Sequence, residues 1–200
     1  ASISDLFEDY KIFGGARFGF NFINNEYLLG FQNNRKRLDW GLLFYRGTNS
    51  YLNVYPLESP FSNLSQKVIT SLYQVNLSYP LDRIRSIRAN IGYRNDRSVV
   101  KPINRFNNQP DVNALSKADT NIHYAVGHLE YVHDNTLNTA QNIWNGLRFK
   151  IYGDYNVNVT NISKTSSTYN IGFDARYYHK IYRNFIWAIR AAGDMSFGDR

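Results

Sequence analysis

The chain has 200 residues, a formal net charge of +7 and a mean hydropathy of −0.47, although 43% of its residues are hydrophobic. No apolar run approaches the roughly 18 residues of a membrane-spanning helix, so a helical membrane protein is excluded. The absence of cysteine excludes a disulfide framework and thiolate metal sites. The basic residues are spread over many segments without forming a continuous patch, so no nucleic-acid partner is expected.

The first half of the chain alternates apolar with polar side chains, and this period of two predicts β-strands. Residues 1–9 are interpreted as a loop or the end of an earlier segment, and they lack the apolar core of a signal peptide. Tight turns are expected at 24–25, at 34–36 and at 80–85, because Asn, Pro and Asp favour turns. The strands expected between these connections are 10–22, 26–33, 38–45, 68–79 and 87–94.

Two stretches of this half have no period and carry prolines, and both are predicted to be long loops. The first, 47–64, has room for a short hairpin around 51–55. The second, 96–118, is polar throughout. Short and long connections therefore alternate along the chain.

The second half begins with a strand at 120–132 whose faces the pattern does not separate, and a β-bulge near Gly127 is expected to shift its phase. A turn-rich connection at 134–145 follows. Next come three segments in which apolar or aromatic side chains alternate clearly with polar or charged ones. The strands predicted there are 147–157, 169–178 and 185–194.

The predicted fold class is an all-β, antiparallel transmembrane β-barrel. The strands are about ten residues long, their apolar sides are rich in Tyr, Phe and Trp, and their connections alternate in length. About nine strands are expected, whereas bacterial single-chain barrels have even numbers. Residues 1–200 are therefore interpreted as a single barrel domain that is incomplete at both ends.

Several segments of the sequence resemble one family. They are RKRLDWGLLFYR (35–46), LSYPLDRIRSIRANIGYR (77–94), NGLRFKIYGDY (145–155), YNIGFDARYYHKI (169–181) and FIWAIRAAGDMSFGDR (185–200). These segments are similar to the barrel of BamA- and TamA-type outer-membrane assembly factors, the bacterial surface antigen superfamily. The first segment resembles members that are fused behind a periplasmic β-propeller. The resemblance covers most of residues 10–200.

This resemblance implies a location and a function. The chain would span about the third to the eleventh strand of a sixteen-stranded barrel in the outer membrane of a Gram-negative bacterium. It would act in the insertion or translocation of other proteins, without enzymatic activity or a cofactor. Its partners would be outer-membrane lipid and lipopolysaccharide, client outer-membrane proteins and other envelope assembly subunits.

The candidate functional residues come from the polar sides of the last three predicted strands. They are expected to form a charged cluster that faces the lumen, made of Arg148, Lys150, Asp154, Asp174, Arg176, Arg190 and Asp194. On the lipid side, each Arg or Lys would cost about 2 to 4 kcal/mol at the membrane midplane. The cluster could hold an inward-folded loop or line a pore. Alternatively, its members only pair across strands and solvate the lumen.

The sequence gives little indication of catalysis or of a metal site. His123, His128 and His133 are spaced five apart, so on a strand they alternate faces and cannot converge on one ion. His133 beside Asp134 could form an acid/base pair, but no second pair of catalytic carboxylates accompanies it. The serines lack a nucleophile-elbow sequence. The chain is therefore not expected to be an enzyme.

Basic residues of the predicted loop 96–118 are a second candidate site. They could bind the phosphates of a surface glycolipid, or they could belong to a solvated extracellular loop without a ligand. These residues are Arg97, Lys101, Arg105 and Lys117.

Two alternatives to the assembly-factor hypothesis remain open at this stage. A passive outer-membrane porin or solute channel would share the charged lumen. A soluble β-sandwich that serves as a binding module would instead pack the apolar sides of its strands into a core.

Overall fold

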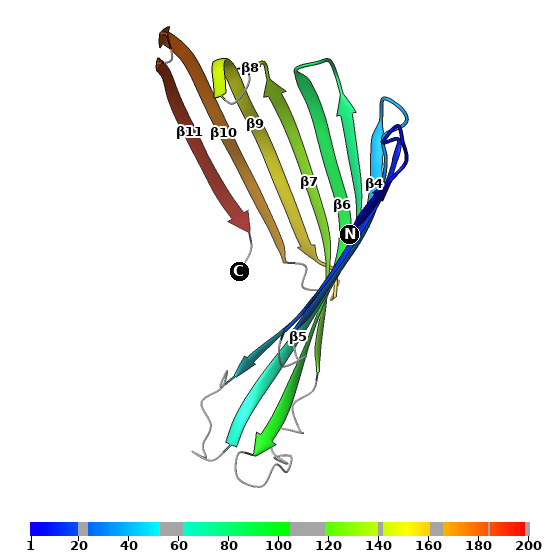
Figure 1. Cartoon of the computed structure of the whole chain (residues 1–200). Helices are drawn as coiled ribbons and strands as arrows, with labels where there is room; N and C mark the ends of the chain where they lie inside the picture. The colour runs from blue at the N-terminus through cyan, green and yellow to red at the C-terminus, as the bar shows by residue number, and fades with distance from the viewer. Residues whose placement is uncertain are drawn as a thin grey trace.

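The computed structural model describes residues 1–19, 24–52, 62–104, 119–139, 142–160, 166–183 and 185–198. These residues form eleven β-strands and no α-helix (Figure 1). The strands are β1 (Ser2–Ser4), β2 (Tyr10–Phe18), β3 (Asn25–Asn33), β4 (Asp39–Leu52), β5 (Ser62–Pro80), β6 (Arg85–Asn104), β7 (Thr120–Asp134), β8 (Leu137–Thr139), β9 (Asn142–Asn158), β10 (Ser167–Tyr182) and β11 (Phe185–Gly198). The predicted all-β class is confirmed.

The strands form an antiparallel sheet in which neighbours in sequence are neighbours in space. The order runs from β1 to β7 and continues with β9, β10 and β11, while β8 pairs only with β9. Antiparallel neighbours need only a short connection, and this explains the tight turns at one end of the sheet (Figure 1). The outermost described strands, β1 and β11, do not pair with each other, so the described sheet is open.

The register is regular and sorts the side chains into two faces. From β5 to β11, leaving β8 aside, even-numbered residues pair with even-numbered residues as far as Lys180, and odd with odd. The predicted bulge at Gly127 is wrong, because this residue pairs with Ile91 and Tyr155 in an uninterrupted register. The apolar Ile122 and Val126 share a face with polar residues further along β7, and this mixture resembled a change of phase.

Strands replace much of the two predicted long loops. The predicted loop at 47–64 is shorter than expected, because β4 and β5 extend into it, and most of the possible hairpin at 51–55 lies outside the described residues. The first part of the predicted loop at 96–118 belongs to β6, including Pro102. That proline is tolerated because β7 begins at Thr120, and β6 therefore has no described neighbour on one side at this point.

Two shorter corrections concern segments predicted as connections. The first nine residues contain β1, which pairs with β2 from Ser2 opposite Phe13 onward. The connection at 134–145 contains β8, which pairs with the start of β9. A strand of three residues is too short to show a period of two, so the sequence pattern did not reveal either one.

Side chains fix the tight turns at the closed ends of the hairpins. In the β5–β6 turn, Asp82 accepts hydrogen bonds from the backbone N–H groups of Ile84 and Arg85 at 2.9 and 2.7 Å. The guanidinium group of Arg37 donates to the carbonyl oxygens of Pro80 and Leu81 at 3.2 and 2.8 Å. The turn before β4 is thereby tied to the turn after β5.

The sheet is a single layer, and no described element covers its odd-numbered side. We call this side, from β5 to β11, the apolar face, and we call the even-numbered side the polar face. None of the described large side chains is fully buried, and Ile171 and Trp187 on the apolar face are 57% and 52% exposed. Within the described residues there is no helix that is long and apolar enough to cross a membrane.

Candidate functional site

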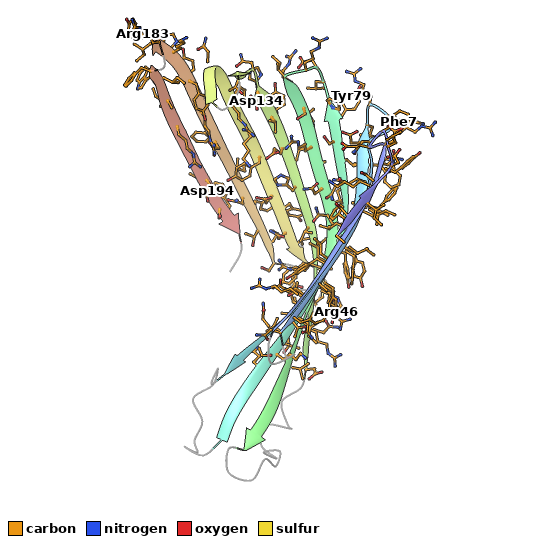
Figure 2. The ribbon with its side chains drawn as sticks, viewed as in Figure 1. Phe7, Arg46, Tyr79, Asp134, Arg183 and Asp194 are labelled. Carbon is orange, nitrogen blue, oxygen red and sulfur yellow. The ribbon has the colours of Figure 1, made fainter. Side chains whose placement is uncertain are left out.

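The residues of the predicted charged cluster all lie on the polar face. All seven have even numbers in β9, β10 and β11, and the register puts them on that face. They separate into smaller groups, most of which include residues of β6 or β7. Asp194 has no ion pair among the described residues, and Figure 2 shows it well along β11, away from the turn at Arg183. Whether the polar face meets a lumen remains a prediction.

Glu130 of β7 is the only charged residue that is buried among the described residues, with 8% of its surface exposed. It lies between Arg88 of β6 and Lys150 of β9. Nη1 of Arg88 lies 3.4 Å from Oε1, and Nζ of Lys150 lies 3.1 Å from Oε2. Each carboxylate oxygen therefore has its own cation, and this pairing offsets the cost of removing the charge from water.

Asp174 of β10 accepts hydrogen bonds from two arginines. Nε and Nη2 of Arg176 lie 3.2 and 3.1 Å from its two oxygens. The same two nitrogens of Arg190 on β11 lie 3.4 and 2.9 Å from these oxygens. Two-pronged bonding from a planar guanidinium group is the strongest pairing that a carboxylate makes with a side chain, so Asp174 is firmly held.

Three arginines stand in one row across the last three strands. Arg176 is directly opposite Arg148 on one side and Arg190 on the other. Like charges in opposite positions destabilise a sheet. Arg148 is paired with Asp134 of β7, whose Oδ2 lies 3.3 Å from Nε, while the other two arginines share Asp174. Three guanidinium groups therefore form ion pairs with only two carboxylates.

A hollow of about 290 Å³ opens among these side chains. Its charged lining consists of Arg88, Glu130, Arg148, Lys150, Asp174 and Arg176. Four of these residues are cations and two are anions, so the lining has a net charge of +2. We call this space the basic hollow.

A second group forms a chain of hydrogen bonds across four strands. Nδ1 of His128 on β7 lies 2.6 Å from Oδ1 of Asp154 on β9. Asn170 of β10 donates to the other oxygen of Asp154 at 3.3 Å, and Ser196 of β11 donates to Asn170 at 3.1 Å. Ser196 and His128 are at opposite ends of this series of hydrogen bonds, so the serine does not contact the imidazole as it would in a catalytic triad. The group therefore links strands.

The other three histidines are on odd-numbered positions, beside aromatic rings. His123 stacks on Tyr93, and His133 stacks on Phe149, with ring centroids 5.8 and 5.1 Å apart. The predicted alternation of His123, His128 and His133 between faces is confirmed. The suggested acid/base pair is wrong, because adjacent residues of one strand point to opposite faces and Asp134 lies on the polar face.

The sequence pattern missed the partners that complete these groups. They are Arg88, His128, Glu130, Asp134 and Asn170. Arg88 lies on β6, and three of the others lie on β7. The expected bulge at Gly127 obscured which residues of β7 share a face. The signal that could have found them is the even numbering of the polar residues, continued through β7 without a break.

The second predicted site is only partly described. Arg97 lies on β6 rather than in a loop, and its Nη2 is 2.7 Å from Oδ2 of Asp119. The side chain of Lys101, and Arg105 and Lys117 altogether, lie outside the described residues. Binding of a glycolipid there remains a prediction.

No metal site is evident in the described part of the chain, where no three His, Asp or Glu side chains gather closely enough to hold an ion. No protein-family model matches the chain, and a search of curated proteins finds no match either. The function of the chain is therefore inferred from the geometry of the two faces and from the resemblance of its sequence segments.

Proposed function

We propose that this chain forms part of a transmembrane β-barrel in the outer membrane of a Gram-negative bacterium. The observation that carries the proposal is the contrast between the two faces of a single-layer sheet. In water, the uncovered apolar face would cost about 25 cal/mol for each Å² of apolar surface. Lipid against that face removes this cost, and only a closed sheet can then satisfy the backbone of every strand.

The apolar face carries an uncharged band that crosses six strands. The band consists of the odd-numbered residues of 73–79, 87–93, 125–131, 149–157, 169–177 and 187–197. In β10, for example, the band has the length that a tilted strand needs to cross a bilayer, about nine to eleven residues. A soluble protein has no reason to exclude charge from an exposed surface of this size.

Aromatic side chains border this band at both ends. Those near the tight turns are Tyr79, Tyr131, Phe149, Tyr177 and Trp187. Those near the longer connections are Tyr73, Tyr93, Tyr155, Tyr169 and Phe197. Within the second row, the rings of Tyr155 and Tyr169 are 4.8 Å apart between centroids. Two such rows are typical of the interfacial girdles of membrane barrels, where rings lie at the level of the lipid headgroups.

Within this class, we propose that the protein acts in the insertion or translocation of other proteins, as BamA-type assembly factors do. The resemblance of the five sequence segments supports this step, as does the meander of long strands. A sixteen-stranded barrel with a weakly closed seam would offer an unpaired strand edge in lipid. An incoming strand would pair with that edge and remove the cost of its unsatisfied backbone groups.

The location and the role are tested separately in cells that make the full-length protein. We expect it to fractionate with the outer membrane and to migrate faster in gels when the sample is not boiled. Its depletion should lower the folded amounts of unrelated outer-membrane barrels. Normal assembly of those proteins after depletion would contradict the insertion role, and recovery of the protein as a monomer in detergent-free buffer would contradict the membrane location.

A passive channel is the second candidate, and the basic hollow on the polar face favours it. Such a channel would show steady single-channel conductance in planar bilayers, and its depletion would leave barrel assembly intact. A soluble sandwich is less well supported, because the described residues form one layer and supply no second sheet to cover the apolar face.

A further inference from the structure

We propose that the basic hollow on the polar face binds a phosphate group. The hollow lies between β6, β7, β9 and β10, and its lining has the net charge of +2 described above. A phosphate monoester carries nearly two negative charges at neutral pH, so it would neutralise the lining. The inference depends on the polar face alone and requires neither a membrane location nor an insertion role.

The two carboxylates of the lining do not bind all the N–H donors of its cations. Asp174 already receives four N–H groups, and each oxygen of Glu130 already has a cation. Arg148 pairs with Asp134 through Nε at 3.3 Å, and its two terminal nitrogens donate no hydrogen bond to another described residue. A guanidinium group presents such nitrogens in a fork that matches two phosphate oxygens.

The row of three arginines gives an independent reason for a bound anion. Arg148, Arg176 and Arg190 face one another across three strands, although like charges in opposite positions destabilise a sheet. A doubly charged anion between them would turn this repulsion into attraction. An uncharged or cationic ligand would leave it in place.

The size of the hollow limits the ligand. Its volume of about 290 Å³ lies at the lower end of the range of small-molecule sites, about 300 to 1,000 Å³. Inorganic phosphate and small phosphomonoesters fit this space, and their many acceptor oxygens match a lining that offers surplus donors.

The test is a calorimetric titration of the full-length protein in neutral detergent with inorganic phosphate, at constant ionic strength kept by chloride. We expect saturable binding of one phosphate per chain. Arg148→Gln should weaken it about tenfold, the effect of losing one charge-assisted hydrogen bond. Phosphorus NMR of the unmodified protein gives a second measurement that does not depend on any variant folding, because bound phosphate broadens its signal.

The matched control is Arg97→Gln. Arg97 is as exposed as Arg148 and likewise pairs with one aspartate, but it lies on an odd-numbered position of β6. Its substitution should leave the affinity unchanged. Repeating the titration in nanodiscs separates two sources of the phosphate. Equal affinity in phosphatidylcholine with and without phosphatidic acid, a phosphomonoester lipid, indicates a soluble ligand, and competition by phosphatidic acid indicates a lipid headgroup. Absence of phosphate binding by the unmodified protein, or an equal loss in both variants, would overturn the proposal.

Discussion

The polar and apolar faces are built from the same strands, yet they are stabilised in different ways. On the polar face, side chains bond to one another across strands, as Glu130 does with Arg88 and Lys150. On the apolar face, side chains such as Ile171 and Phe173 remain about half exposed. The side chains of the polar face therefore bond to one another, whereas the apolar face has no described element packed against it.

This difference accompanies the absence of fully buried large side chains among the described residues. A soluble domain buries apolar side chains between two layers, and its charges meet water. Here ion pairs and hydrogen bonds link the side chains of the polar face, and the hydrophobic side chains of the apolar face remain exposed. This contrast predicts that a charged side chain introduced on the apolar face lowers stability strongly. The same substitution on the polar face should change stability little.

The largest effect is expected from a charge on the apolar face. Val75 lies between Leu42 and Ile91, whereas its neighbour Gln74 lies on the polar face. Val75→Arg should lower the free energy of unfolding in lipid vesicles by about 2 to 4 kcal/mol, the cost of a cation near the midplane. Gln74→Arg should change it by about 0.5 kcal/mol or less. Urea titrations of the two variants measure the difference, and equal effects would contradict the assignment of the faces.

The next effect concerns the buried charge of the polar face. Glu130→Gln leaves Arg88 and Lys150 without a counter-charge in a partly enclosed space, so stability should fall by about 2 kcal/mol. Glu26→Gln is the control, because its carboxylate is more exposed and lies 3.8 Å from Arg17. Its effect in the same urea titration should be below about 0.5 kcal/mol. If Glu26→Gln proved as damaging as Glu130→Gln, burial would not be the reason for the loss.

A smaller effect is expected from two glycines. The ring of Tyr152 lies against Gly172 on the polar face, so a side chain there must displace it. A side chain at Gly153, on the apolar face, would meet only the backbone oxygen of Asn170, at an ordinary contact distance of 3.8 Å. Gly172→Val should destabilise the fold by about 1 kcal/mol, and Gly153→Val should be neutral or slightly stabilising, because valine suits a strand. The urea midpoints of the two variants in vesicles measure the difference. Destabilisation by Gly153→Val without destabilisation by Gly172→Val would contradict the expected crowding at Gly172.

The alternation of side chains predicted strands well only where the two faces differ in polarity. The last three strands were predicted closely, because Phe149, Ile171 and Trp187 alternate with charged residues through the whole uncharged band. Beyond that band, β6 carries Asn95 and Arg97 on one face and Asp96 on the other. Both faces are polar there, so the period disappears although the strand continues.

The candidate site was predictable only in its charged members on β9, β10 and β11, and neither their partners on β6 and β7 nor their pairing could be predicted. Arg148, Lys150 and Asp174 were identified from alternation alone, since this fixes the face of each residue within one strand. Their partners depend on the register between strands, and local sequence does not contain that register. The row of three arginines therefore became visible only when β9, β10 and β11 were aligned.

The smallest effect is expected at the β5–β6 turn, which lies outside both faces. The hydrogen bond from the side chain of Arg85, at 2.6 Å, lowers the pKa of Asp82 below its ordinary value of about 3.9. A lowered pKa in the folded state means that Asp82 contributes stability above about pH 4, and that this contribution is lost as the pH falls through the lowered pKa. Asp82→Asn should therefore reduce the urea midpoint slightly at pH 7, and the reduction should shrink as the pH is lowered toward 2 and Asp82 becomes protonated. Because the turn is exposed, the shift should be smaller than that of Gly172→Val, and a larger one would mean that this turn, rather than the faces, dominates the stability of the sheet.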